Sequence, residues 1–242
     1  MKTFRISEHW LYLLFILFYS GNTFPNELIQ SKGAVVTSNA LATEAGEKIL
    51  AEGGNAYDAA TTISAMLSVV EPFASGLGGG AFWLIYDAKS KKYTMLDARE
   101  TAPLQSHKNM YLDENENVIK NMSTLGPLSA GIPGIPAVLG HVNDKYGSKK
   151  LSTLLTPAYR AAINGFPVNE RYLKGANYKK KWLKKYKETE AIFLHNGEVP
   201  KKGWILKQTD LAKTIKKIMK DGHKSFYTGS FAKKMVESVQ NN

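Results

Sequence analysis

Arg99 is the residue whose type and position best suit substrate recognition. It follows a strand-like run and lies between two carboxylates, Asp97 and Glu100. An arginine guanidinium can grip a carboxylate at two points, because its planar fork of N–H donors matches the two oxygens. The competing interpretation is a surface or structural ion pair between Arg99 and a nearby acid. Spacing alone favours this second interpretation.

A glycine cluster precedes the same run of apolar residues and invites comparison with phosphate-binding loops. Dinucleotide-binding loops need a strand before the glycines and a helix after them, whereas here a predicted helix precedes them and a strand follows. The cluster also lacks the Gly-Lys-Ser/Thr ending of the phosphate-binding loop found in nucleoside triphosphatases. The cluster therefore predicts a tight turn with positive φ that lets the backbone approach its neighbours. Its members are Gly76, Gly78, Gly79 and Gly80.

Composition excludes several kinds of chemistry. The 242 residues contain no Cys, which excludes disulfides, Cys-ligated zinc, Cys nucleophiles and iron–sulfur clusters. No histidine pair has metal-ligand spacing, so we expect no metal and no cofactor. A Ser–His–Asp triad remains possible, although no G-x-S-x-G elbow marks a nucleophile. The scattered histidines are His9, His107, His141, His195 and His223.

The chain carries a formal net charge of +11, which can attract anions, nucleic acid or an anionic membrane. Eight basic residues lie in 171–187, interleaved with aromatic residues that could stack on bases. However, Tyr178, Trp182 and Tyr186 recur every four residues, which is typical of a buried stripe on an amphipathic helix with solvated lysines around it. We therefore expect no nucleic-acid partner.

The first residues resemble a secretory signal. Lys2 and Arg5 precede the apolar run Trp10–Tyr19, which is too short to span a bilayer comfortably. We expect a signal peptide in residues 1–20, a mature N-terminal segment in 21–32 and a partial large domain in 33–242. The protein is then exported to the periplasm or the extracellular space, and contacts a membrane only if the signal is uncleaved.

The remaining pattern predicts a layered α/β or α+β domain. Ser38 or Asn39 is expected to cap the first helix and Asn55 the second, which is apolar nearly all round and therefore buried. Two antiparallel strands, 81–87 and 93–97, follow the glycines. Further helices are expected at 136–145, 154–164, 169–186, 209–220 and 229–239, and further strands at 33–37 and 191–194.

Several segments together resemble the gamma-glutamyltransferase (gamma-glutamyl transpeptidase) family. The match covers nearly everything after the signal, and the order and spacing of its segments make it specific. The segments are ILAEGGNAYDAA (49–60), SGLGGGAFWLIYD (75–87), LDARETAP (96–103), SAGIPGIPAVL (129–139), PAYRAAINGFPVN (157–169) and FYTGSFAKKMVE (226–237).

The resemblance implies an N-terminal-nucleophile hydrolase fold, an α+β arrangement of αββα layers that is incomplete in this chain. In the family, a precursor cleaves itself into a large and a small subunit. The new N-terminal Thr of the small subunit attacks the gamma-carbonyl of glutathione or a related amide, and the acyl group passes to water, an amino acid or a peptide. Arg99 matches the arginine that grips the substrate α-carboxylate.

The nucleophilic Thr, and hence every catalytic residue, is missing from this sequence. The resemblance therefore implies a truncated large subunit that is inactive alone, exposes apolar sheet surface and tends to aggregate. Alternatives are a cephalosporin-type acylase of the same fold and a non-catalytic exported binding protein that uses its basic surface. The preference for hydrolysis or transfer, the donor and the acceptor stay open.

Overall fold

The computed structural model describes residues 33–240. They belong to one compact unit, Gly33–Asn242. The predicted signal peptide, residues 1–20, and the segment 21–32 lie outside the described residues. Within the described part of the chain, no helix has both the length and the apolar character needed to cross a bilayer.

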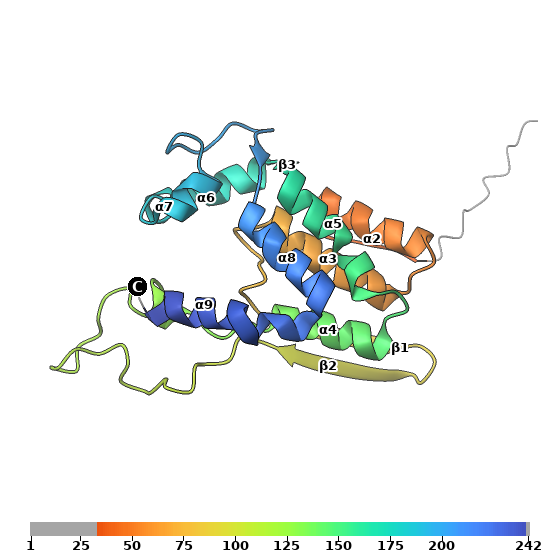
Figure 1. Cartoon of the computed structure of the whole chain (residues 1–242), viewed down its shortest axis with the longest axis horizontal. Helices are drawn as coiled ribbons and strands as arrows, with labels where there is room; N and C mark the ends of the chain where they lie inside the picture. Colours follow the sequence, from red (N-terminus) through yellow and green to blue (C-terminus); the bar gives the residue numbers. More distant parts are fainter. Residues whose placement is uncertain (1–32, 241–242) are drawn as a thin grey trace, which may run out of the picture. The chain divides into compact units, whose positions relative to one another are not determined.

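The described elements mix helices with short antiparallel strands, which confirms the α+β class (Figure 1). The helices predicted between residues 136 and 164 and between 209 and 239 are confirmed, with ends shifted by a few residues. In chain order the elements are α2 (Ala40–Ala51), α3 (Ala56–Val70), β1 (Ala81–Asp87), β2 (Lys92–Ala98), η1 (Pro127–Ser129), α4 (Ile135–Tyr146), α5 (Leu151–Asn164), β3 (Phe166–Pro167), α6 (Glu170–Leu183), α7 (Lys187–Phe193), β4 (Ile205–Leu206), α8 (Thr209–Asp221), η2 (His223–Phe226) and α9 (Gly229–Gln240).

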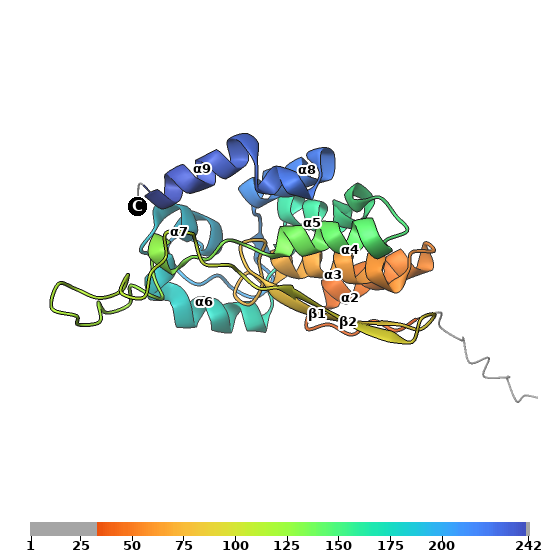
Figure 2. The ribbon, with the colours of Figure 1, turned by 90° about the horizontal axis from the view of Figure 1, so that it is seen from below.

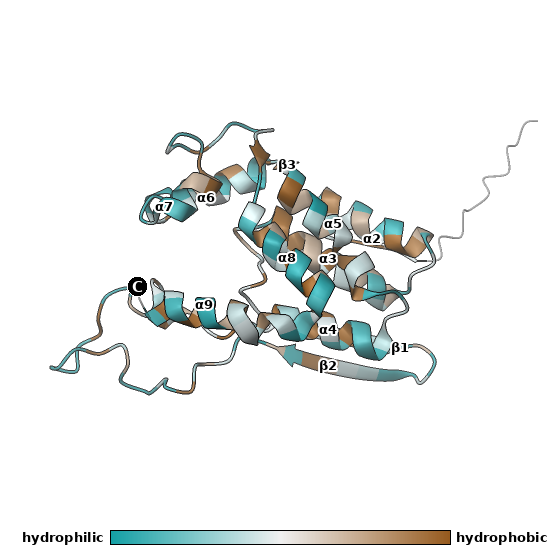
Figure 3. Ribbon diagram, viewed as in Figure 1, coloured by the Kyte–Doolittle hydropathy of each residue, from teal (hydrophilic) through white to brown (hydrophobic). Residues whose placement is uncertain are grey.

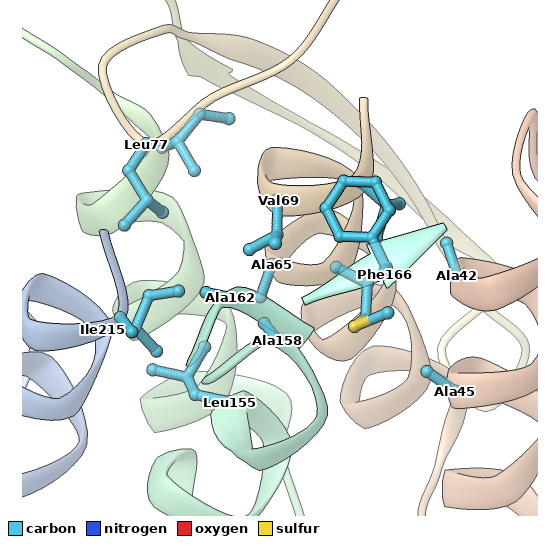
Figure 4. Close-up of a cluster of buried hydrophobic side chains, with 14 of the residues drawn as sticks. Ala42, Ala45, Ala65, Val69, Leu77, Leu155, Ala158, Ala162, Phe166 and Ile215 are labelled. Carbon is cyan, nitrogen blue, oxygen red and sulfur yellow. The ribbon is translucent and has the colours of Figure 1, made fainter. Parts of the chain in front are cut away.

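Helix α3 is the centre of the helical layer. It packs against α2, α4 and α5, and α8 packs on α5. Its small and apolar residues let neighbours approach from several sides, which confirms that this helix is buried. Ala65 and Val69 of α3 meet Ala158 of α5 and Ile215 of α8 in one core cluster (Figure 4). Figure 3 shows hydrophilic and hydrophobic residues alternating along α8, whose lysines stay outside this core.

Strands β1 and β2 form the predicted hairpin, which runs along the helical layer (Figure 2). Trp83 and Ile85 lie on the inner face of β1, whereas Leu84 and Met95 lie opposite each other on the outer face. Leu84 is 68% exposed and Met95 is 60% exposed. The predicted uncovered apolar sheet surface is thus present in the described residues. Its exposed members are Phe82, Leu84, Tyr86, Tyr93 and Met95.

Asparagine caps start helices where the sequence places them. The side chain of Asn39 accepts from Leu41 N, and that of Asn55 accepts from Asp58 N. Asp58 returns a bond by accepting from Asn55 N at 3.0 Å, which completes a capping box. The carboxylate is fully buried and also accepts from Ser148 N at 3.0 Å and from the Ser148 hydroxyl. One side chain therefore fastens the start of α3 to the turn between α4 and α5.

Hydrogen bonding decides the ionisation of Asp58. Burial raises the pKa of its carboxyl, but the hydrogen bonds from Ser148, Asn55 and Lys149 outweigh burial and hold the pKa below its usual value. The unfolded chain therefore takes up this proton at a higher pH than the folded chain. The resulting stabilisation is present above about pH 4 and is lost as pH falls through the folded-state pKa.

Two strand predictions were wrong. Residues 33–37 form no strand, and Val36 is 94% exposed. An apolar β-branched run becomes a strand only where a second strand satisfies its backbone, and none pairs with it among residues 33–240. Residues 191–193 belong to helix α7 instead of a strand, because the chain from Lys187 continues as a helical turn before it reaches Leu194.

The predicted aromatic stripe on the lysine-rich helix was also wrong. Helix α6 buries Tyr172 and Ala176, whereas Tyr178 is 81% exposed. The helix ends at Leu183, so the four-residue period does not continue to Tyr186 on one face. Lys179 and Lys181 instead lie over the rings of Tyr178 and Trp182, with the ammonium 5.1 Å and 5.6 Å from the ring centroids.

We expect Asp58→Asn to lower the free energy of unfolding by about 1–3 kcal/mol, because the amide cannot accept all the bonds that the charged carboxylate accepts. Urea unfolding of the 242-residue chain, followed by circular dichroism at pH 7 and in a series of buffers that descends below about pH 4, measures this change. The difference between variant and parent should shrink as the pH falls below about 4, because the Asp58 carboxyl of the folded parent then takes up its proton. Glu114→Gln is the matched control, since Glu114 is exposed, and should change stability by at most about 0.5 kcal/mol.

The 242-residue chain alone should self-associate through the outer face of the hairpin. Leu84→Lys with Met95→Glu places opposite charges across this pair and should shift the chain toward monomer without changing its helical content. Light scattering after size-exclusion chromatography measures the change. Val118→Lys, at an equally exposed apolar residue away from the hairpin, should leave self-association as it was. An unchanged particle mass in the hairpin variant would contradict the prediction.

Candidate functional site

Arg99 follows the last residue of β2 and leaves the hairpin on a short turn. The Asp97 carboxylate accepts from Arg99 N at 2.9 Å, which fixes the direction of the backbone there. The Arg99 side chain is 67% exposed, and its Nε lies 3.2 Å from Glu100 Oε2. No second carboxylate among residues 33–240 lies within ion-pair distance of Arg99. The side chain is thus largely open to solvent, and Arg99 is one of the residues that line the neighbouring cavity.

A cavity of about 500 Å³ lies beside Arg99. The end of β2 forms one wall, and the first turns of α4, with Pro133, Gly134 and His141, form another. Tyr227, which directly follows η2, completes the lining. The guanidinium therefore borders a space large enough for a small substrate, instead of being locked into a packed interior.

Two glycine-containing segments support the backbone from which Arg99 projects. A Cβ at Gly134 would lie 2.0 Å from Ala98 O, and a Cβ at Gly80 would lie 2.6 Å from the same oxygen. The amide of Gly134 donates to Gly79 O at 2.9 Å, so the two segments also bind each other. Only residues without a side chain permit this close approach on both sides of the strand end.

The prediction for the glycine cluster is confirmed in part. None of its four glycines has a positive φ, so that part of the prediction was wrong. The close approach is confirmed, because Gly80 packs against the backbone of Ala98 and Glu100. The cluster lines a second hollow of about 380 Å³ together with Phe73 and Glu100. Glu100, which lines this hollow, is the residue whose carboxylate pairs with Arg99.

Sequence reasoning identified one residue of this site and missed others. It predicted Arg99, which the structure brings together with Thr101, His141 and Tyr227 around one cavity. Tyr227 lies in the segment FYTGSFAKKMVE, but nothing in that pattern connects it with residue 99. Among residues 33–240, no three His, Asp or Glu side chains are grouped as metal ligands would be.

Comparison with known proteins places this geometry in a family. The gamma-glutamyltranspeptidase family model matches residues 42–242. The glutathione hydrolase proenzyme of Bacillus subtilis strain 168 is 40% identical over 211 residues, which are 86% of this chain and 35% of that protein. The chain therefore spans about a third of the length of this curated relative.

Solved structures give the same result. Gamma-glutamyltranspeptidase from Helicobacter pylori superposes with a TM-score of 0.84 at 39% identity, over 87% of this chain and 60% of that one. Cephalosporin acylase from Bacillus halodurans superposes with a TM-score of 0.72 at 26% identity, over 83% of this chain and 38% of that one. The lower identity disfavours the acylase alternative.

These neighbours have the N-terminal-nucleophile hydrolase fold that the sequence predicted, and the described residues contribute a helical layer and a hairpin to it. The family model covers most of the chain, including the hairpin, the Arg99 segment and the cavity wall. The chain belongs to the gamma-glutamyltranspeptidase family.

Proposed function

We propose that this chain forms part of a gamma-glutamyltransferase or glutathione hydrolase in which Arg99 holds the α-carboxylate of the gamma-glutamyl substrate. The observation that supports this role is an exposed guanidinium at a strand end, beside a cavity of about 500 Å³. The pair with Glu100 uses Nε, which leaves both terminal nitrogens for two-point contact with a carboxylate.

The proposed reaction is acyl transfer. A Thr hydroxyl attacks the gamma-carbonyl carbon, the amide C–N bond breaks, and the hydroxyl proton passes through a base to the leaving amine. Water or an amino acid then takes the glutamyl group from the ester. We assign the Thr to the part of the relatives' length that this chain does not span. The role of Arg99 is to fix the substrate so that its gamma-carbonyl meets this hydroxyl.

The partner that we propose for the outer hairpin face is the small subunit cut from the same precursor. Leu84, Met95 and their neighbours form an exposed apolar patch on a two-stranded sheet, and such a patch is typical of a surface that another chain covers. The curated relative from Bacillus subtilis is named a proenzyme, which is consistent with a processed precursor.

We also propose export of the protein to the periplasm or the extracellular space. The support is the basic start and the apolar run Trp10–Tyr19, which together are typical of a secretory signal. Any membrane contact is then limited to this N-terminal segment while it remains uncleaved.

Arg99→Lys in the complete enzyme should raise KM for glutathione about tenfold or more, while folding stays intact. Lysine keeps the charge but loses the two-point contact, and one charge-assisted hydrogen bond contributes about 1.5–3 kcal/mol. Steady-state kinetics measures the change. Arg160→Lys is the matched control, since Arg160 is exposed on α5 and lines neither cavity. An unchanged KM in the Arg99 variant would refute the assignment.

The purified 242-residue chain should not release the chromophore from a gamma-glutamyl anilide. The carboxylate-binding residue is present, but the nucleophile that we assign to the remainder of the protein is not. A spectrophotometric assay against the complete enzyme at equal concentration tests this. Turnover above the uncatalysed rate would show that a residue of this chain acts as the nucleophile.

A further inference from the structure

The hydroxyl of Tyr227 occupies an unusual place in the wall of the Arg99 cavity. It accepts a hydrogen bond from Ala137 N at 3.0 Å and donates one to Pro133 O at 2.8 Å. Ala137 lies in the first turn of α4, where a backbone amide has no acceptor within the helix, and Pro133 precedes the N-cap residue Gly134. The hydroxyl therefore bridges the first turn of α4 and the segment that leads into it.

The Tyr227 hydroxyl supplies the N-terminal cap that the residues next to helix α4 do not provide. Gly134 is the N-cap residue and has no side chain to accept from the first amides. Tyr227 takes that role from 90 residues further along the chain. Burial of its half-buried ring raises the pKa of the phenol, with the Ala137 bond acting in the opposite direction. The phenol consequently keeps the proton that it donates to Pro133.

The segment that Tyr227 holds is the one that supports Arg99. Gly134 N and Ile135 N donate to Gly79 O at 2.9 Å and 3.0 Å. Thr101 and Ile132 exchange two backbone hydrogen bonds, of 3.2 Å and 2.8 Å. The segment 131–134 thus bonds to Thr101 just after residues 99–100 and packs on Ala98 O just before them, so a shift of the segment moves the stem of Arg99.

We propose that Tyr227 is a positioning residue for the carboxylate site, which ties the segment 131–134 to the first turn of α4 and thereby fixes the direction of the Arg99 side chain. This role rests on the proposed function of Arg99. Tyr227 acts on Arg99 through Pro133 and Gly134, so loss of its hydroxyl weakens recognition of the carboxylate without removing any reacting group.

The test uses the complete enzyme and two donors, a gamma-glutamyl anilide and a 4-aminobutyryl anilide. The second has the same amide but lacks the α-carboxylate. Tyr227→Phe keeps the ring and removes only the hydroxyl. The ratio of kcat/KM for the first donor to that for the second should fall about 3- to 10-fold. A merely structural role would lower both values alike and leave the ratio unchanged, which would overturn the proposal.

Tyr178→Phe is the matched control, because Tyr178 is an exposed tyrosine on α6 that lines neither cavity. It should leave the ratio unchanged within twofold. Thermal unfolding of each variant separates stability from positioning. A lower unfolding temperature for Tyr227→Phe with the parent's donor ratio would also overturn the proposal.

A double-substitution cycle separates this inference from the proposed function. If Tyr227 acts through Arg99, Tyr227→Phe should change the ratio less than twofold in an Arg99→Lys background. If the two substitutions instead change the donor ratio independently, so that their effects multiply, the inference about Tyr227 is overturned while the proposed role of Arg99 stands. A parent-like ratio in Arg99→Lys itself would overturn the proposed carboxylate site, and the inference with it.

Discussion

The close packing of three backbone segments at the end of β2 is the constraint on which the site depends. Gly80 and Gly134 approach Ala98 O from two sides, at distances that leave no room for a Cβ. Because the Thr101–Ile132 hydrogen bonds continue this contact past residue 99, the stem of Arg99 has little freedom. A fixed stem lets a long side chain keep its guanidinium in one region at small entropic cost.

The helical layer makes this packing possible. Helix α4 packs against α3 and also contacts β2 of the hairpin. Asp58 fastens the start of α3 to the turn that follows α4. The other face of the hairpin has no such support among residues 33–240 and presents apolar side chains to solvent. The part of the fold that carries Arg99 is therefore well packed on one side and incomplete on the other, as expected for a chain that spans about a third of its curated relative.

Local signals predicted most helices and the hairpin. Asn39 and Asn55 cap their helices with side-chain oxygens, an interaction between neighbours in sequence. Two of the failures have a common physical reason, because each depended on distant partners. Among residues 33–240, no strand pairs with 33–37, and Tyr178 lies on an exposed side of α6. Periodicity indicates which residues share a face, but burial depends on what packs against that face.

The sequence by itself determined the family resemblance, most of the helices and the position of Arg99 just after a strand, since all of these depend on residue types at short spacings. Only the tertiary structure revealed that Tyr227 bonds to Pro133 and Ala137, and that glycines from two segments enclose one carbonyl. Such contacts join residues up to 94 positions apart. No local pattern encodes them, because they arise only when the packed core brings the segments together.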